Sequence, residues 1–352
     1  MISVKNVARA AVVGAMVLLA AGAVQAITID TVPVGNPNNA ADTRYVTPGY
    51  GAVAYTYNIG KYEVTAGQYM AFLNAVAKTD TYELYNGGMD PAAYSYACNI
   101  IRSGLSGGYT YRVVDGWADR PVNCVSLADA MRFANWLHNG QPTGAQDAGT
   151  TEDGAYTLTS DGIANNTISR NTGVARWAVT SEDEWYKAAY YDPNKGGIGV
   201  PGYWDYPTGS NTAPGRDMAD PLPGNNANYN GTPLLPLSPI DSGKYTTVAG
   251  EFQNSDSPYG TFDQGGNLWE WNETIIGSYR GLRGGAFLYA DYTLLASMQL
   301  NENPAAQGGS TGFRVSELSE PISGPIPEPV TMAGMVLGIG GLVGYIRRRM
   351  AR

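Results

Sequence analysis

Three stretches of the chain place apolar residues at helical spacing directly after a capping pair. Gln68 stands three residues after Thr65, and positions 69, 72, 73 and 76 are apolar. The same spacing follows Ser126, with apolar positions 130, 133, 134 and 137, and Ser181, with apolar positions 185, 188 and 189. In such a box the first and fourth side chains each bond the other residue's backbone N–H. The pattern predicts three amphipathic helices that begin just after these residues, the second ending at Asn139-Gly140 and the third at Asp192-Pro193.

Short runs rich in β-branched and aromatic residues surround the helices. They predict strands at residues 55–59, 109–114, 156–159, 177–180, 280–288 and 313–315. Trp269 and Trp271 flank Glu270 at period two, which places both indoles on one side of an extended segment and the carboxylate on the other. Residues 192–259 show no such pattern, and a stretch this long needs an organiser, for which a bound cation is one candidate. The fold class predicted is α+β, in one domain over residues 27–318.

Residues 1–26 have the features of a secretory signal peptide. Lys5 and Arg9 are basic, residues 10–19 are apolar, and residues 24–26 (Val-Gln-Ala) form a small-x-small cleavage site. The alternative is an uncleaved anchor at the start of the chain. The short apolar run favours cleavage after Ala26.

The last residues predict a membrane anchor. Residues 330–346 are uncharged and would span about 25 Å as a helix, and four arginines follow within residues 347–352. A buried core helix would not explain this basic end, which is expected to stay cytoplasmic. The sequence Pro327, Glu328, Pro329 closes a spacer over residues 319–329, ahead of the predicted transmembrane helix and tail over 330–352. The order resembles a PEP-CTERM sorting signal, which implies processing by an exosortase-type membrane protease in an envelope with an outer membrane and exopolysaccharide.

Composition narrows the function classes. The two ends carry six of the 22 Lys and Arg and none of the 31 Asp and Glu, which leaves residues 27–329 with a net charge of −15. Nucleic-acid binding is therefore not expected, because phosphate contacts need basic patches. A single His excludes a site of two or three imidazoles, and two Cys exclude a four-thiolate zinc site.

Several signatures then follow one another in a fixed order. They are residues 59–65 (Ile-Gly-Lys-Tyr-Glu-Val-Thr), 120–126 (Arg-Pro-Val-Asn-Cys-Val-Ser), 181–185 (Ser-Glu-Asp-Glu-Trp), 266–271 (Gly-Asn-Leu-Trp-Glu-Trp), 283–285 (Arg-Gly-Gly) and 312–314 (Gly-Phe-Arg). The series resembles the formylglycine-generating enzyme (sulfatase-modifying factor) family over residues 55–316. The resemblance implies a C-type-lectin-like fold with a small twisted sheet, two or three helices and long ordered loops. We expect most of these motif residues to be structural landmarks, since aromatics and glycines at such spacing usually pack.

The resemblance also implies a reaction for which this sequence lacks the metal-binding residues. Members of the family oxidise a substrate cysteine with copper held by two thiolates, six and eleven positions beyond the Arg of the Arg-Gly-Gly motif. Counted from Arg283, these positions hold Tyr289 and Leu294. Neither offers the soft ligand that Cu(I) prefers, so copper and formylglycine formation are not expected and no catalytic residue is assigned.

The other sulfur and imidazole groups have separate predictions. Cys98 and Cys124 are expected to form a disulfide in an exported chain, with a relocated copper pair and free thiols as alternatives. His138, at the predicted end of the second helix, is expected to be a surface or capping residue. A related branch that binds iron through several His is excluded by this count.

The resemblance further implies structural calcium. The first site would take side chains of Asp263 and Glu270 with carbonyls of Gly266 and Leu268, and the second Asn228 and Asp241 with carbonyls of Tyr229 and Gly243. Such hard oxygen donors suit Ca²⁺. The alternative is that Asp263 and Glu270 hydrogen-bond turn backbone instead.

The leading functional hypothesis is an exported, membrane-tethered, non-catalytic domain that serves as a binding or structural module of the cell envelope. Its ligand would be a polysaccharide or a protein, and Tyr203, Trp204 and Tyr206 either contact it or pack in the core. The alternative is a copper-dependent or otherwise rearranged protein-modifying oxidase. A passive surface-coat component is the third possibility.

Overall fold

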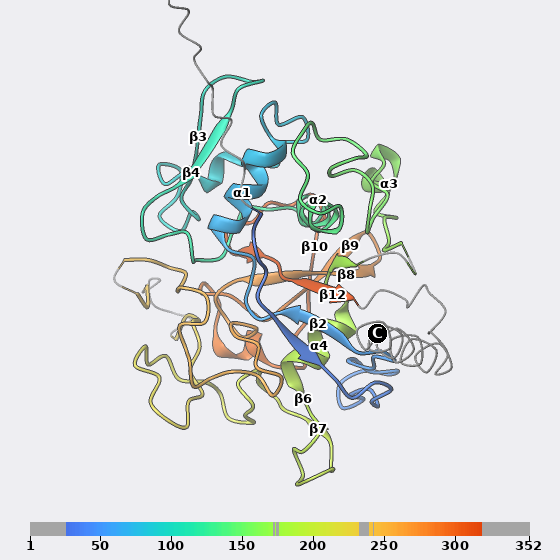
Figure 1. Cartoon of the computed structure of the whole chain (residues 1–352). Helices are drawn as coiled ribbons and strands as arrows, with labels where there is room; N and C mark the ends of the chain where they lie inside the picture. Colours follow the sequence, from blue (N-terminus) through green and yellow to red (C-terminus); the bar gives the residue numbers. More distant parts are fainter. Residues whose placement is uncertain (1–25, 172, 174–175, 232–238, 242, 319–352) are drawn as a thin grey trace, which may run out of the picture.

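The computed structural model describes residues 26–171, 173, 176–231, 239–241 and 243–318 (Figure 1). The helices are α1 (Ala66–Val76), α2 (Leu127–His138), α3 (Ser160–Ala164) and α4 (Glu182–Tyr190), with 3-10 turns η1 (Gly87–Met89) and η2 (Asp291–Leu294). The strands are β1 (Thr31–Val34), β2 (Tyr57–Gly60), β3 (Ile100–Ser103), β4 (Thr110–Val113), β5 (Trp177–Val179), β6 (Tyr191–Asp192), β7 (Gly202–Tyr203), β8 (Trp269–Ile276), β9 (Tyr279–Arg283), β10 (Leu300–Glu302), β11 (Thr311–Gly312) and β12 (Val315–Leu318).

The predicted targeting segments fall almost wholly outside these residues. This holds for the signal peptide apart from Ala26, for the spacer with Pro327, Glu328 and Pro329, and for the transmembrane helix. Among the described helices, none combines the length and the apolar character needed to cross a membrane. Export and anchoring therefore stay predictions.

The three predicted helices are confirmed as α1, α2 and α4. Thr65, Ser126 and Ser181 are their N-caps, and each caps the helix through both bonds of the capping box. The short helix α3, capped by Thr159, was not predicted because five residues are too few to show a helical period.

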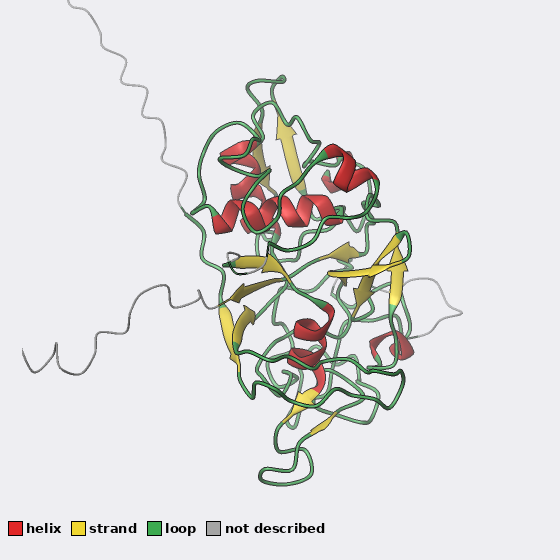
Figure 2. Cartoon of the chain, turned by 90° about the vertical axis from the view of Figure 1, so that its right-hand side faces the viewer, coloured by secondary structure: helices red, strands yellow, loops and turns green. Residues whose placement is uncertain are grey.

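Two four-stranded sheets form the middle of the domain (Figure 2). The first has the order β1-β2-β12-β5, so a strand near the end of the domain lies between strands from its beginning and its centre. The second has the order β10-β9-β8-β11, and β11 runs parallel to β8 while the other pairs are antiparallel. These mixed sheets and few helices agree with the predicted α+β class.

Three strand predictions need correction. Residues 156–159 form no strand, because Tyr156 makes only an isolated bridge with Arg170. The run predicted over 280–288 ends at Arg283, because Gly284 and Gly285 turn the chain with φ values of +97° and +76°. The strand expected over residues 313–315 begins only at Val315.

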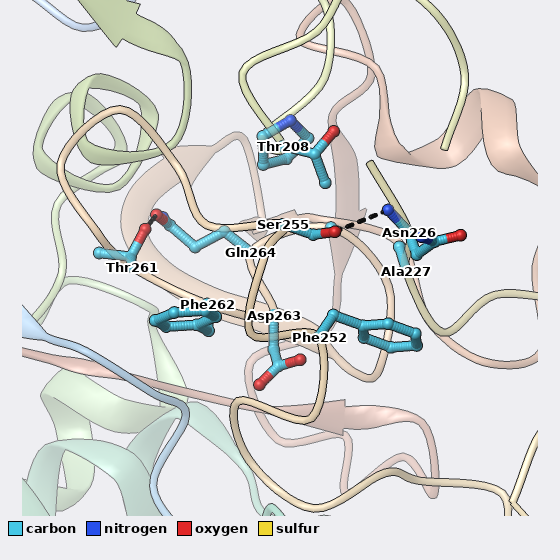
Figure 3. A pocket seen from close by; sticks show the side chains of 11 residues that line it. Thr208, Asn226, Ala227, Phe252, Ser255, Thr261, Phe262, Asp263 and Gln264 are labelled. Carbon is cyan, nitrogen blue, oxygen red and sulfur yellow. Dashed lines mark hydrogen bonds between the residues drawn. The ribbon is translucent and has the colours of Figure 1, made fainter. Parts of the chain in front are cut away.

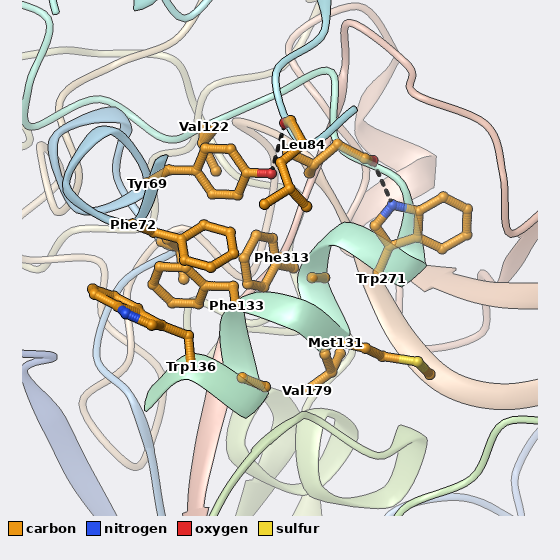
Figure 4. Close-up of a cluster of buried hydrophobic side chains, with 14 of the residues drawn as sticks. Tyr69, Phe72, Leu84, Val122, Met131, Phe133, Trp136, Val179, Trp271 and Phe313 are labelled. Carbon is orange, nitrogen blue, oxygen red and sulfur yellow. Dashed lines mark hydrogen bonds between the residues drawn. The ribbon is translucent and has the colours of Figure 1, made fainter. Parts of the chain in front are cut away.

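Aromatic residues from both helices and sheets fill the main core (Figure 4). Phe72 of α1 packs edge-on against Phe133 of α2 at a centroid distance of 5.4 Å, and Phe133 packs against Phe313 at the same distance. Helices α1, α2 and α3 lie on one side of the sheets and α4 lies on the other (Figures 1 and 2). The sheets, which carry several of the motif residues, therefore lie between helices on both sides.

A buried carboxylate organises part of the long irregular stretch. Asp220 accepts hydrogen bonds from Asn226 Nδ2 at 2.9 Å, the Asn254 N–H at 2.5 Å and Ser255 Oγ at 2.6 Å. Its side chain thus ties together loop segments that lie 34 and 35 residues apart. Asp220 thus organises locally a stretch for which the sequence makes a bound cation one candidate organiser.

Candidate functional site

Glu270, on β8, lies at the centre of a buried network of motif residues. Both carboxylate oxygens accept hydrogen bonds at 2.6 Å from the guanidinium of Arg314. Trp185 of α4 donates its indole N–H to Glu270 Oε2 at 2.8 Å. Glu270 and Arg314 are fully buried, so their charges offset each other out of contact with water.

A second buried ion pair joins two further motifs. Arg283, the last residue of β9, donates to Glu182 of α4 at 2.5 Å and to the Ala296 carbonyl at 2.9 Å. Its guanidinium also lies 4.5 Å from the Tyr50 ring centroid and 5.2 Å from that of Tyr186. The arginine of the Arg-Gly-Gly motif therefore holds α4 to the sheet.

Glu63 extends this network from the N-terminal half. Its carboxylate accepts hydrogen bonds from Asn267 Nδ2 at 2.7 Å and the Leu268 N–H at 3.1 Å. Burial, followed by the nearby charges of Asp263 and Glu270, raises the pKa of Glu63 well above its ordinary value. Three acids, Glu63, Asp263 and Glu270, thus lie near the same cation, the Arg314 guanidinium. Its positive charge offsets the repulsion among them.

The first predicted calcium site is crowded in this structure. Asp263 accepts a hydrogen bond from the Gly250 N–H at 2.6 Å, and burial raises its pKa to about 6. Figure 3 shows its carboxylate flanked by the rings of Phe252 and Phe262, beside a cavity of about 10 Å³. That volume suits about one water molecule.

Glu270, the other predicted side-chain ligand of this site, is already engaged, because both of its carboxylate oxygens bond Arg314. Gly266 and Leu268, whose carbonyls were predicted to complete the site, donate their N–H groups to the Gly284 carbonyl and to Glu63, bonds that fix this turn without involving the two carbonyls. Asp263 thus follows the alternative of hydrogen bonding to turn backbone, whereas Glu270 bonds the side chains of Trp185 and Arg314.

An arginine also occupies the second predicted calcium site. Arg120 pairs with the carboxylate of Asp241. Asn228 donates its side-chain N–H to the Tyr245 carbonyl at 2.8 Å, and the hydroxyl of Tyr229 donates to the Pro214 carbonyl at 2.6 Å. Gly243 is exposed.

At each position an arginine therefore pairs with one of the predicted carboxylate ligands, and the side chains as placed do not offer that carboxylate to a calcium ion. Over the part of the chain that the structure describes, no group of three or more His, Cys, Asp or Glu side chains is arranged to hold a metal. Calcium remains a prediction from the resemblance alone.

Tyr289 and Leu294, at the positions where the resemblance implies copper-binding cysteines in the family, lie in different surroundings. Leu294 is fully buried in an apolar cluster with Tyr206, Ala227 and Tyr229. A Cβ placed on Gly285 would lie only 2.8 Å from Leu294 Cδ1, so the leucine packs tightly on the Arg-Gly-Gly turn. Its side chain fills the space where a second thiolate was expected.

Tyr289, by contrast, reaches the surface. It is 38% exposed, and its ring packs edge-on against Trp269 at a centroid distance of 5.6 Å. A phenol here provides a contact surface and supplies no soft metal ligand.

The predicted disulfide between Cys98 and Cys124 is not formed, which corrects that expectation. Both residues are free thiols buried within the main hydrophobic core. Burial raises the pKa of Cys98 to about 11 and that of Cys124 to about 12, so both stay protonated at neutral pH. Neither lies in the cluster around Leu294.

The remaining singled-out residues have structural contacts. Tyr203 and Tyr206 are buried, while Trp204 is half-buried and donates its indole N–H to Asp192 at 3.1 Å. His138, the last residue of α2, accepts a hydrogen bond from the Arg176 N–H at 3.0 Å. These contacts agree with core packing for the tyrosines and with a position at the helix end for the histidine.

A much larger cavity, of about 700 Å³, was not anticipated from the sequence. It lies beside α2 and α3, and its lining comes from five separate stretches between Tyr82 and Gln307. No local motif marks such a cavity, because the residues that form it meet only in the folded chain.

Comparison with known proteins places the chain in a family. Residues 4–317 match the family model described as "Sulfatase-modifying factor enzyme 1-like domain". No curated protein sequence matches the chain. Among solved structures, the Treponema denticola variable protein 1 is similar with a TM-score of 0.50 and 17% identity, over 85% of this chain and 97% of that one.

Two further solved structures are more distant. CarF matches with a TM-score of 0.46 and 20% identity, over 83% of this chain and 99% of that one. PvdO from Pseudomonas aeruginosa matches with a TM-score of 0.42 and 17% identity, over 83% and 92%. The family model covers most of the chain, and the chain therefore belongs to the sulfatase-modifying factor enzyme 1-like domain family.

Proposed function

We propose that this protein is a member of its family without oxidase activity, which serves as a binding or structural module of the cell envelope. The observation that carries the proposal is the buried Leu294, packed against Gly285 where a copper-binding thiolate was expected. Without a soft ligand at this position or at Tyr289, Cu(I) has no thiolate pair to bind there.

The chain's own cysteines do not replace the missing pair. Cys98 and Cys124 lie in the core cluster of α1 and α2, and burial keeps both thiols protonated. A rearranged oxidase would need thiolates that open onto a substrate groove. The buried ion pairs of Glu270 with Arg314 and of Glu182 with Arg283 support the fold, because each carboxylate is bonded to a guanidinium from a distant part of the chain.

The test is oxidation of a cysteine in a peptide. The purified protein, loaded with Cu(I), is incubated in air with a sulfatase-type peptide that contains Cys, and the products are analysed by mass spectrometry. An active member of the same family serves as the positive control. We expect the peptide to keep its thiol, and conversion of the cysteine to an aldehyde would overturn the proposal.

The same proposal places the domain outside the cell, tethered through residues 330–352 and processed by an exosortase-type protease. It rests on the basic and apolar order of residues 1–26 and on the Pro-Glu-Pro motif ahead of an apolar stretch and four arginines. Changing Pro327, Glu328 and Pro329 together to Ala is expected to leave an unprocessed, membrane-bound chain in fractionated cells. Recovery of the unaltered chain in the cytoplasmic fraction would contradict export.

A further inference from the structure

A cavity of about 700 Å³ opens between α2, α3 and the loops after β8 and β10. This volume lies within the range of about 300–1,000 Å³ that small-molecule sites occupy. Neither Tyr289 nor Leu294 lines it, so it is separate from the positions where family chemistry would be expected. Its residues have no role in the network around Glu270.

One of the residues that line the cavity is a carboxylate with an oxygen that is not hydrogen-bonded within the described residues. Asp129 is 2% exposed, and its Oδ2 accepts hydrogen bonds from the Ser126 N–H at 2.9 Å, Ser126 Oγ at 2.7 Å and Gln307 Nε2 at 2.9 Å. Within the described residues its Oδ1 has no hydrogen-bond partner. Three bonds therefore fix the orientation of the carboxylate and leave an acceptor available to a ligand.

An aromatic platform stands at the rim. Tyr82 is 41% exposed, and the guanidinium of Arg132 lies 4.2 Å from its ring centroid. Arg132 is itself held by two hydrogen bonds to Glu152, at 2.7 and 2.9 Å. The Tyr82 N–H donates to Gln146 Oε1 at 2.8 Å. A ring held in this way offers a rigid apolar face with little entropy left to lose on binding.

The charges that line the cavity cancel. Glu83 and Asp129 are acidic, while Arg132 and Arg280 are basic. Arg280 is buried and already donates to Asn166 Oδ1 at 2.5 Å and to the Ile168 carbonyl at 2.6 Å. The exposed polar side chains that remain are amides and a hydroxyl, from Asn165, Ser278 and Asn303. Such groups both donate and accept hydrogen bonds, which suits a ligand rich in hydroxyl groups.

We propose that this cavity binds a neutral oligosaccharide, with Asp129 accepting hydrogen bonds from sugar hydroxyls and Tyr82 stacking on the apolar face of a ring. This inference rests on the proposed function as a binding module and names its ligand class. A strongly acidic polysaccharide is disfavoured, because residues 27–329 carry a net charge of −15.

The test is direct titration of the purified full-length chain in detergent. The probes are neutral tetrasaccharides of glucose, galactose and mannose, compared with oligogalacturonate and with an unrelated acidic peptide, by isothermal titration calorimetry. At least one neutral tetrasaccharide is expected to bind, with a dissociation constant between about 1 μM and 1 mM. Tyr82→Ala is expected to weaken this binding about tenfold, and Ala305→Trp, which fills the cavity, to abolish it.

Two matched variants control for general effects of these changes. Tyr94→Ala removes another exposed tyrosine, and Ala92→Trp adds an indole at another exposed alanine, both outside the cavity lining. Both are expected to bind as the unaltered chain does. The melting temperature of each variant shows that it folds, and either cavity variant alone is sufficient for the test.

Two results would overturn the inference. One is binding of only the acidic probes or of none, and the other is sugar binding that Tyr82→Ala and Ala305→Trp leave unchanged. The second result would mean that the sugar binds at another site on the domain. Neither result bears on the aldehyde assay, so failure of the cavity and failure of the non-oxidase proposal are distinguishable.

Discussion

At the scale of single residues, the recognisable motifs are explained by pairing between buried charges. Glu270 bonds Arg314, and Glu182 bonds Arg283. The motifs identify these residues from the sequence as candidates for a structural role. They do not reveal the partners, because Glu270 and Arg314 are 44 residues apart and come together through the pairing of β8 with β11, which lies just before Arg314 in the chain.

Removing Arg314 tests how much this pairing contributes. Arg314→Met leaves Glu270 buried without a cation, close to Glu63 and Asp263, so we expect the free energy of unfolding to fall by about 3–5 kcal/mol in urea denaturation. The exposed arginine of the Arg176–Glu317 pair is the matched control, since Arg176→Met should cost under about 1 kcal/mol. Equal losses in the two variants would contradict the role given to Arg314.

The cysteines give a second prediction at this scale. Because Cys98 and Cys124 are buried and protonated, we expect iodoacetamide at neutral pH to label neither in the folded chain. Both should react once the chain is unfolded in denaturant without reductant, as mass spectrometry would show. Labelling of the unfolded chain only after reduction would instead establish the disulfide expected from the sequence.

At the scale of elements, local signals predicted the helices well and the strands less well. Thr65, Ser126 and Ser181 fix helix starts through bonds to residues three positions away, which a sequence displays directly. The end of β9 depends on the left-handed turn at Gly284, and residues around Tyr156 lack a partner strand. Strand pairing is decided by distant segments, so an isolated β-like run is weak evidence.

Glu184 in the capping box of α4 predicts a pH dependence. Burial pushes its pKa upward, but the Arg170 guanidinium and hydrogen bonds from Arg170, Tyr55 and the Ser181 N–H outweigh burial and hold it at about 2. Its pKa in the unfolded chain is near 4.5. The folded state therefore binds fewer protons in this interval, and its contribution is complete above pH 4.5 and is lost as the pH falls toward 2.

The contribution amounts to about 3 kcal/mol and is measurable by urea denaturation at a series of pH values. Glu184→Gln should reduce the loss of stability between about pH 5 and pH 2 by that amount. Glu317→Gln, at the exposed Arg176 pair, serves as the control and should leave the profile unchanged. An identical acid profile for Glu184→Gln and the unaltered chain would contradict the assignment.

At the scale of the whole molecule, the ordered motifs were sufficient to predict the family and the α+β class. The sequence did not predict the arginines that pair with the proposed calcium ligands, or the large cavity. Both depend on how loops from distant parts of the chain pack against one another. Asp220 illustrates the difficulty, since its partners Asn226, Asn254 and Ser255 have no periodic signal.

The arginines that pair with predicted calcium ligands at both positions lead to a prediction about the thermal stability of the whole domain. Because Arg120 pairs with Asp241 and Arg314 with Glu270, we expect the melting temperature to be the same in EDTA and in millimolar calcium. A bound ion at 100 times its dissociation constant would add about 2.7 kcal/mol. A rise of several degrees with calcium, and none with magnesium, would show that the arginines yield to a cation in solution.

A Cu(I) competition titration measures whether the buried Leu294 leaves this position without a copper ligand. The full-length chain and its Tyr289→Cys/Leu294→Cys variant are titrated against a chromophoric Cu(I) chelator under anaerobic conditions. We expect the unaltered chain to leave the copper with the chelator. A double-cysteine variant that folds and binds copper would show that only the two thiols are missing at these positions. Retention of one equivalent of Cu(I) by the unaltered folded chain would mean that the protein binds copper without them.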